Sequence, residues 1–238
     1  HLAISNGAET SRTAMEDGTH IVRFADTMVM SSYLVALVVG PLVATPARHV
    51  NGTPTRVVHV DGKGHLTQFA LDAADAGLRF FEEYYGIDYP SDKLDLVALP
   101  DFSAGAMENL GCITFRENLL LVDPTTSTQQ EQQNVVEVLN HELAHMWFGD
   151  LVTMRWWNGI WLNEAFATFM GVDATDHYRP EWKRWTSFAL DRSAAFEVDS
   201  LSTTRPVEFT VTSPREAEGM FDVLTYQKGG ALLRMLQQ

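Results

Sequence analysis

The pentapeptide His141-Glu142-Leu143-Ala144-His145 constrains this chain more than any other feature. In an α-helix, residues four apart lie about 6 Å apart along the axis and about 40° apart around it, so both imidazoles project from one face. Two histidines and one carboxylate are a common ligand set for catalytic zinc, with the fourth position left open to water. We therefore predict that Glu164 supplies the third ligand from a second helix packed beside the first.

The segment around this pentapeptide is apolar on most of the circumference of a helix. Its apolar residues are Val135, Val136, Val138, Leu139, Leu143, Met146, Trp147 and Phe148. Such a helix lies inside a domain, where a His-Glu-His cluster has to be paired or bound to metal. Thr128 and Glu131 form a capping-box pattern at its start, and Gly149 is typical of a helix end. This context disfavours the alternative, a chance arrangement of charges on a solvated helix face.

The predicted zinc site favours hydrolysis. Zinc lowers the pKa of a bound water from about 15.7 toward 7. A carboxylate one residue past the first ligand can act on that water as a general base, and Glu142 occupies this position. A substrate carbonyl attacked by the water develops an oxyanion, which needs a hydrogen-bond donor.

Four motifs in this order cover roughly residues 20 to 238 with their surroundings. They are Gly105-Ala106-Met107-Glu108-Asn109, residues 141–154, residues 156–167, and Phe221-Asp222 followed by Tyr226-Gln227-Lys228-Gly229. Together they resemble the aminopeptidase N (alanyl aminopeptidase) family of the gluzincin clan, which includes the leukotriene hydrolase branch. The resemblance implies an α+β fold: a thermolysin-like zinc metallopeptidase catalytic domain with a small mixed sheet and a helical half.

The resemblance also implies roles for individual residues. One Zn²⁺ per chain is expected on His141, His145 and Glu164, and the Tyr226 hydroxyl is expected to stabilise the oxyanion. From the residues alone, an ordinary amphipathic side chain near a helix start is the better interpretation of Tyr226, and only the motif match reverses this preference.

Glu108 is expected to pair with the free ammonium group of a peptide substrate, which would make the enzyme an exopeptidase. The resemblance places Gly105, Ala106, Met107 and Asn109 in the same substrate channel. If the loop is taken alone, a solvated surface glutamate is the better interpretation of Glu108, and only the five-residue match reverses this preference.

We therefore expect a zinc aminopeptidase that hydrolyses the amino-terminal bond of peptides with a free amino terminus. One alternative is another hydrolysis at the same metal, such as the epoxide opening of the leukotriene hydrolase branch. A second alternative is a non-catalytic interaction module descended from a peptidase. Its expected sign is eroded ligands, and all three ligand positions are intact.

Several positions depart from the pattern of the family, and one is Asn158-Gly159-Ile160, where relatives usually have Asn-Asp-Leu or Asp-Asp-Leu. Gly171 stands where the family has a glutamate close to a ligand histidine, and loss of such a partner can cost 10- to 100-fold in metal affinity. Asp173 and Asp150 are candidate substitutes. Arg205 stands before a proline where relatives often have histidine, and the sequence offers no physical account of this exchange.

Composition limits the partners. The net charge of −14 disfavours nucleic acid. The longest apolar stretch, Tyr33 to Ala44, is too short for a membrane span of about 20 residues. The lone Cys112 excludes an internal disulfide and favours the cytoplasm. We expect a monomer, and because the chain begins at His1 rather than Met, we expect its natural start to be missing.

The pattern along the chain predicts two parts. Residues 1–60 read as strands that end a β-rich amino-terminal domain with its linker, and residues 61–238 as a peptidase domain truncated at its carboxy-terminal end. The predicted strands are Ile21–Phe24, Tyr33–Val39, Arg56–Val60, Lys93–Leu99 and Cys112–Phe115, the last two pairing antiparallel. The predicted helices are one from Leu71 to Tyr85, ended by Gly86, and others after Thr128, Pro180 and Ser213.

Overall fold

The structure is a computed structural model that describes residues 1–237. The chain divides into two compact units, His1–Leu139 and Asn140–Gln238, and each is described here by itself. The first unit carries the sheets and the second is helical, so the predicted α+β class is confirmed. The division falls within helix α2, Gln129–His145.

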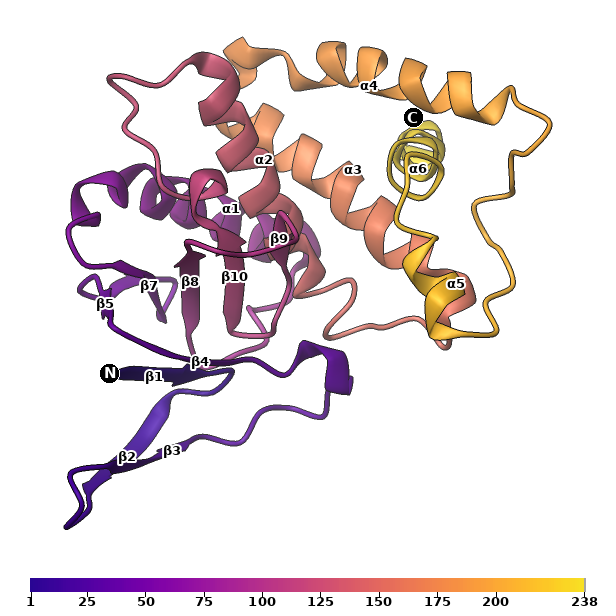
Figure 1. Cartoon of the computed structure of the whole chain (residues 1–238). Helices are drawn as coiled ribbons and strands as arrows, with labels where there is room; N and C mark the ends of the chain where they lie inside the picture. Colours follow the sequence, from indigo (N-terminus) through magenta and orange to yellow (C-terminus); the bar gives the residue numbers. More distant parts are fainter. Residues whose placement is uncertain (238) are drawn as a thin grey trace. The chain divides into compact units, whose positions relative to one another are not determined.

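The first unit contains two small antiparallel pairs and one larger sheet (Figure 1). Its elements are β1 Leu2–Ser5, β2 Glu9–Ala14, β3 His20–Phe24, β4 Leu37–Gly40, β5 Leu42–Ala44, β6 Arg48–Val50, β7 Thr53–Val60, α1 Gln68–Tyr85, β8 Leu94–Leu99, β9 Ala106–Met107 and β10 Cys112–Arg116. Strand β1 pairs with β4, and β2 pairs with β3. The larger sheet has the order β5-β7-β8-β10-β9, and β6 also pairs with β7.

Strand β8 lies in the interior of this sheet. Its residues from Leu94 to Ala98 are all buried, as expected of a central strand covered on both faces. Helix α1 contacts β6 and β7, and it buries Phe69, Leu78 and Phe81. Gly86 ends α1 in the left-handed conformation, with φ of 62°, which confirms the predicted helix end.

The predicted antiparallel pairing of the strands at 93–99 and 112–115 is wrong. Strands β8 and β10 run parallel, with Cys112 opposite Asp95 and Arg116 opposite Leu99. The short strand β9 lies between them in sequence and pairs antiparallel with β10 at the sheet edge. The connection therefore reverses direction twice before β10 begins, and two reversals restore the direction of β8.

The run from Tyr33 to Val39 is not one strand, because Ser32–Leu34 forms a 3-10 turn and β4 begins at Leu37. The predicted domain boundary between residues 60 and 61 stays a prediction, although β7, which precedes it, pairs in parallel with β8, which follows it.

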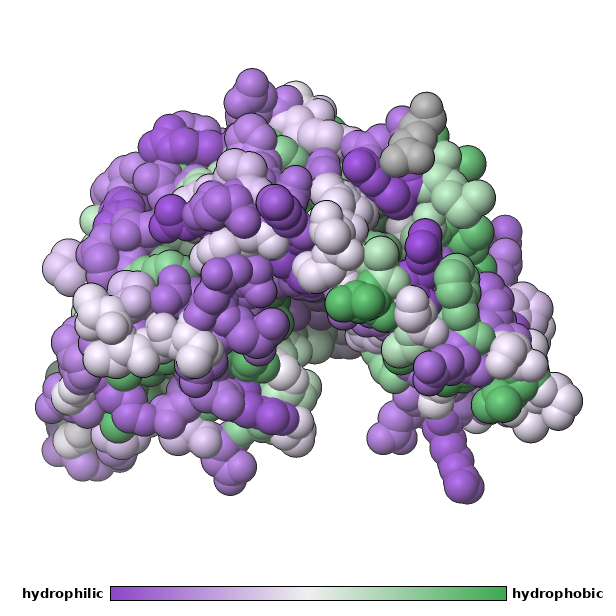
Figure 2. Space-filling view, turned by 90° about the horizontal axis from the view of Figure 1, so that it is seen from above, coloured by the Kyte–Doolittle hydropathy of each residue, from purple (hydrophilic) through white to green (hydrophobic). Residues whose placement is uncertain are grey.

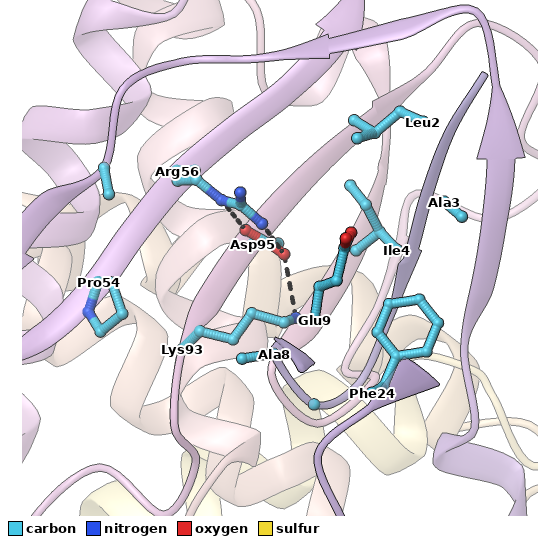
Figure 3. Close-up of a pocket in the computed structure, with 12 residues that line it drawn as sticks. Leu2, Ala3, Ile4, Ala8, Glu9, Phe24, Pro54, Arg56, Lys93 and Asp95 are labelled. Carbon is cyan, nitrogen blue, oxygen red and sulfur yellow. Dashed lines mark hydrogen bonds and ion pairs between the residues drawn. The ribbon is translucent and has the colours of Figure 1, made fainter. Parts of the chain in front are cut away.

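The buried carboxylate of Asp95 on β8 connects this strand to the neighbouring strand β7 (Figure 3). Asp95 is fully buried and accepts two hydrogen bonds from Arg56, at 2.7 and 2.8 Å. The Lys93 ammonium lies 3.0 Å from the same carboxylate and donates to the carbonyl of Gly111. A buried charge is tolerated only when it is paired in this way. The three charged side chains line a cavity of about 270 Å³.

The second unit is built from helices around α3. Its elements are a 3-10 turn Trp157–Gly159, α3 Ile160–Tyr178, a 3-10 turn Pro180–Trp182, α4 Arg184–Asp199, α5 Pro214–Glu218, a π-turn Leu224–Lys228 and α6 Gly229–Gln237. Helix α3 contacts α4, α6 and the π-turn. Ser213 caps α5 by accepting from the backbone N–H of Glu216, as predicted. Pro180 opens a 3-10 turn instead of the predicted α-helix, and α4 begins only at Arg184.

The surface matches the composition of the chain. Hydrophilic side chains predominate on the face drawn in Figure 2. Within residues 1–237, none of the helices combines the length and the apolar character that crossing a membrane requires.

The buried thiol of Cys112 gives a test of the first unit. Cys112 packs against Ile4, Ala36, Val58 and Val97, and burial raises its pKa to about 11. Only about one thiol in a thousand is then ionised at pH 8. We expect the native protein to react with a disulfide reagent such as DTNB at least about a hundredfold more slowly than the protein in concentrated guanidinium chloride. Equal rates in the two states would contradict this packing.

Candidate metal centre

Helix α2 fixes the two candidate histidine ligands. The predicted capping box forms at its start: the Thr128 N–H donates to the Glu131 carboxylate at 2.8 Å, and the Glu131 N–H donates to the Thr128 hydroxyl at 3.3 Å. The helix then runs to His145, so it ends earlier than the predicted end at Gly149. Its apolar side chains are mostly buried, as predicted, and His145 is buried with them.

The ligand atoms of His141, His145 and Glu164 converge. The Nε2 atoms of the two histidines are 3.2 Å apart, and Oε2 of Glu164 lies 3.3 Å from one and 3.4 Å from the other. Ligands at about 2.1 Å from a tetrahedral ion lie about 3.4 Å from one another, so this triangle has the size of one face of such a site. These three residues can therefore hold a metal ion.

His145 is oriented by a backbone carbonyl. Its Nδ1 lies 2.9 Å from the carbonyl oxygen of Phe148, which can only accept, so Nδ1 carries a proton and Nε2 faces the other ligand atoms. Gly149, with φ of 141°, makes this turn possible, because a Cβ there would lie only 3.0 Å from Nδ1 of His145.

The backbone carbonyl of Phe148 is the outer hydrogen-bond partner of His145. A metal-bound histidine usually donates its second N–H to a carboxylate, a backbone carbonyl or water, and here Phe148 supplies that acceptor. Gly171 itself is buried and accepts a hydrogen bond from the Thr175 hydroxyl. Asp173, one of the candidate substitutes, instead accepts from the indole of Trp185 at 3.1 Å.

Glu164 is held as a carboxylate. It is buried on α3, and burial disfavours its charged form. The positive charge of His145 and hydrogen bonds from His141 and His145 outweigh the burial, so the pKa of the Glu164 carboxyl lies well below its usual range. An ionised carboxylate is the form that binds a metal ion.

Tyr226 lies on the π-turn just before α6, close to the predicted helix start. Its ring stacks on the imidazole of His141, with centroids 5.9 Å apart and 25° between the planes. Such π-turns are rare and occur frequently at functional sites. Glu142, the predicted base, is buried on α2 between the two histidines in sequence. The structure thus brings the ring of Tyr226 to the histidine pair.

The predicted substrate-binding residues belong to the first unit, and the three candidate ligands belong to the second. Ala106 and Met107 form β9, and Glu108 is buried, with 7% of its surface exposed, which rules out a solvated loop glutamate. Asn109 has structural contacts: its amide accepts from Thr114 at 2.9 Å and donates to a backbone carbonyl at 3.3 Å. The substrate-binding role of Gly105 and its four successors stays a prediction.

Sequence reasoning missed the carbonyl of Phe148 as a partner of His145. Every residue carries a backbone carbonyl, so no side-chain pattern marks this one. The only sequence signal is Gly149, which was read as a helix end and in fact permits the tight turn that brings the carbonyl to the imidazole.

Comparison with known proteins identifies the family. Residues 69–238 match the Peptidase family M1 domain. The chain is 44% identical over 216 residues to aminopeptidase M1-A of Oryza sativa subsp. japonica, which covers 91% of this chain and 25% of that protein. It is 43% identical over 242 residues to aminopeptidase 2 of Candida albicans, covering 100% of this chain and 26% of that protein.

A third relative is the mitochondrial aminopeptidase 2 of Saccharomyces cerevisiae, 44% identical over 225 residues that cover 94% of this chain and 24% of that protein. This chain belongs to peptidase family M1, which confirms the family resemblance of its motifs. It spans about a quarter of the length of these curated relatives.

The ligand triangle predicts metal binding. We expect the purified protein to hold about one divalent metal ion per chain, because three ligand atoms converge at a spacing that fits one ion. His145→Ala should lose most of this metal in elemental analysis after dialysis. His20→Ala, which removes an exposed histidine on β3, is the control and should keep it. Equal metal content in the two variants would contradict the assignment of His145 as a metal ligand.

Proposed function

We propose that this chain is the catalytic part of a zinc aminopeptidase that removes the amino-terminal residue of peptides. The convergence of His141, His145 and Glu164 from two helices of a family M1 chain is the observation that carries the proposal. The ligand set supports zinc in particular, because two imidazoles and one carboxylate leave an open position on a four-coordinate ion.

Zinc bound there supplies an acidified water and polarises the substrate carbonyl. Glu142 then takes the proton from the attacking water and passes it to the departing amine. This role needs a carboxylate beside the ligands, and Glu142 directly follows His141 on α2.

Tyr226 donates the hydrogen bond that stabilises the oxyanion formed from the substrate carbonyl. The stacking of its ring on His141 supports this role, because it holds the side chain beside a ligand. A donor held in advance costs no reorganisation when the charge develops, which is why such donors are worth about 10²- to 10³-fold in turnover.

Glu108 binds the free ammonium group of the substrate and makes the enzyme an exopeptidase. Its burial supports this role, because a buried carboxylate needs a positively charged or hydrogen-bonding partner, and a substrate ammonium provides one. Substrate side-chain preference is left open by these residues.

The role of Glu142 is tested by Glu142→Gln in the full-length protein. The amide keeps the shape of the side chain but removes the base, so turnover of an aminoacyl chromogenic amide should fall by at least about 10²-fold while bound zinc is retained. Glu197→Gln, an exposed change on α4, should leave turnover unaltered. If Glu142→Gln works as fast as the parent, another group activates the water.

The exopeptidase role is tested by Glu108→Ala in the full-length protein. Loss of the partner of a buried charge should cost about 2 to 5 kcal/mol of transition-state stabilisation on substrates with a free amine. Amino-acetylated substrates should be poor for the parent and should suffer no further loss, because they present no charge to pair. Glu16→Ala, an exposed change between β2 and β3, serves as the control. An equal loss on both substrate types would make Glu108 a structural residue.

A further inference from the structure

The end of α4 and the segment that follows it hold the π-turn that carries Tyr226. The turn spans Leu224–Lys228, and one ion pair lies just before it and another at its last residue. Arg205 contacts Asp222 on one flank, and Asp199 contacts Lys228 on the other. Tyr226 lies between the two fastened flanks.

Arg205 is bound tightly on the first flank. Its Nη2 donates to the Asp222 carboxylate at 2.7 Å, to the Thr225 hydroxyl at 3.1 Å and to the carbonyl of Met220 at 3.2 Å. Its Nη1 donates to the carbonyl of Pro206 at 3.2 Å. The side chain is only 13% exposed, so these charge-assisted bonds are poorly screened by water.

Asp222 connects Arg205 to the backbone of the turn through hydrogen bonds. The oxygen that accepts from Arg205 also accepts from the backbone N–H groups of Leu224 and Thr225, at 3.0 and 3.1 Å. The backbone carbonyl of Asp222 accepts from the N–H of Tyr226 at 3.0 Å. Arg205 therefore holds the residue that fixes the backbone of Tyr226 and of the two residues before it.

The second flank has a matching attachment. Asp199 accepts from the Lys228 ammonium at 2.7 Å and from the Thr204 hydroxyl at 2.6 Å. Thr204 directly precedes Arg205, so one short stretch of chain contributes to both attachments. A turn pinned before and after Tyr226 leaves its ring little freedom to leave the imidazole of His141.

We propose that Arg205 is a positioning residue for Tyr226, acting through Asp222 and Thr225. The inference rests on the proposed function, in which the Tyr226 hydroxyl stabilises the oxyanion. Arginine suits the task because its planar fork reaches the Asp222 carboxylate with one nitrogen and the carbonyl of Pro206 with the other. A lysine ammonium is a single point and can replace only part of this set.

Turnover by the full-length protein gives the first test. Arg205→Ala should lower kcat on an aminoacyl chromogenic amide by about 10- to 100-fold with KM changed less than about twofold, because the oxyanion forms only in the transition state. Arg205→Lys should recover part of the loss. Arg215→Ala is the control, because Arg215 is an exposed residue of α5.

A double-mutant cycle separates positioning from general structural support. Tyr226→Phe removes the hydroxyl, so adding Arg205→Ala to it should lower kcat by less than about twofold further. A merely structural role predicts the same loss from Arg205→Ala with and without the hydroxyl, and that result would overturn the inference. So would a Tyr226→Phe variant with the turnover of the parent.

Hydrogen exchange gives a readout that needs neither metal nor activity. In the metal-free protein, Arg205→Ala should speed exchange of the amides of Leu224, Thr225 and Tyr226 at least about tenfold, with the Arg215→Ala variant unchanged. Unchanged exchange would overturn the inference even if kcat falls. If the parent hydrolyses no aminoacyl amide, the proposed function fails together with the inference; if the parent is active and Arg205→Ala matches Arg215→Ala, the inference alone fails.

Discussion

The second unit depends on the burial of Glu164 between two imidazoles. An isolated carboxylate cannot be buried without a large loss of hydration, so it requires partners at hydrogen-bond or coordination distance. His141 and His145 provide them at 3.3 and 3.4 Å. The need to keep the two histidine Nε2 atoms and Oε2 of Glu164 in contact constrains the rotation of α2 about its axis and the position of α3. A rotation of either helix by one residue would separate these three atoms.

Close packing brings the tyrosine-bearing turn to the same place. Gly229 begins α6, and a Cβ there would lie 2.6 Å from the Cβ of Ala165, the residue after Glu164. Only glycine lets the end of the π-turn approach α3 so closely. The wider π-turn also shifts the residues before α6 relative to a regular helix, and this shift sets the side on which Tyr226 emerges. Backbone features thus bring the tyrosine to His141, and the hydrogen bonds of the Asp222 side chain to the turn add to them.

The sequence predicted those parts of the structure whose signals are local. The spacing of His141 and His145, the capping box of Thr128 and Glu131, and the αL end at Gly86 each depend on a few neighbouring residues, and the structure contains all three. The direction of β10 relative to β8 depends instead on the path of the connection, and the two-residue strand β9 was too short to be recognised. Pro180 fits the start of a 3-10 turn as well as that of an α-helix, so composition could not decide between them.

Two of the departures from the family pattern have different physical settings. At Gly171 a carboxylate side chain is missing, and His145 is oriented by the neutral carbonyl of Phe148. A carbonyl can fix the orientation of the ring as a carboxylate does, but it adds no negative charge. The negative charge that the structure shows in contact with the histidine pair comes from Glu164. At Arg205 the exchange adds a positive charge, and Asp222 balances it at 2.7 Å. The arginine therefore needs no partner beyond Asp222 to offset its charge, and this ion pair offsets the cost of burying the guanidinium.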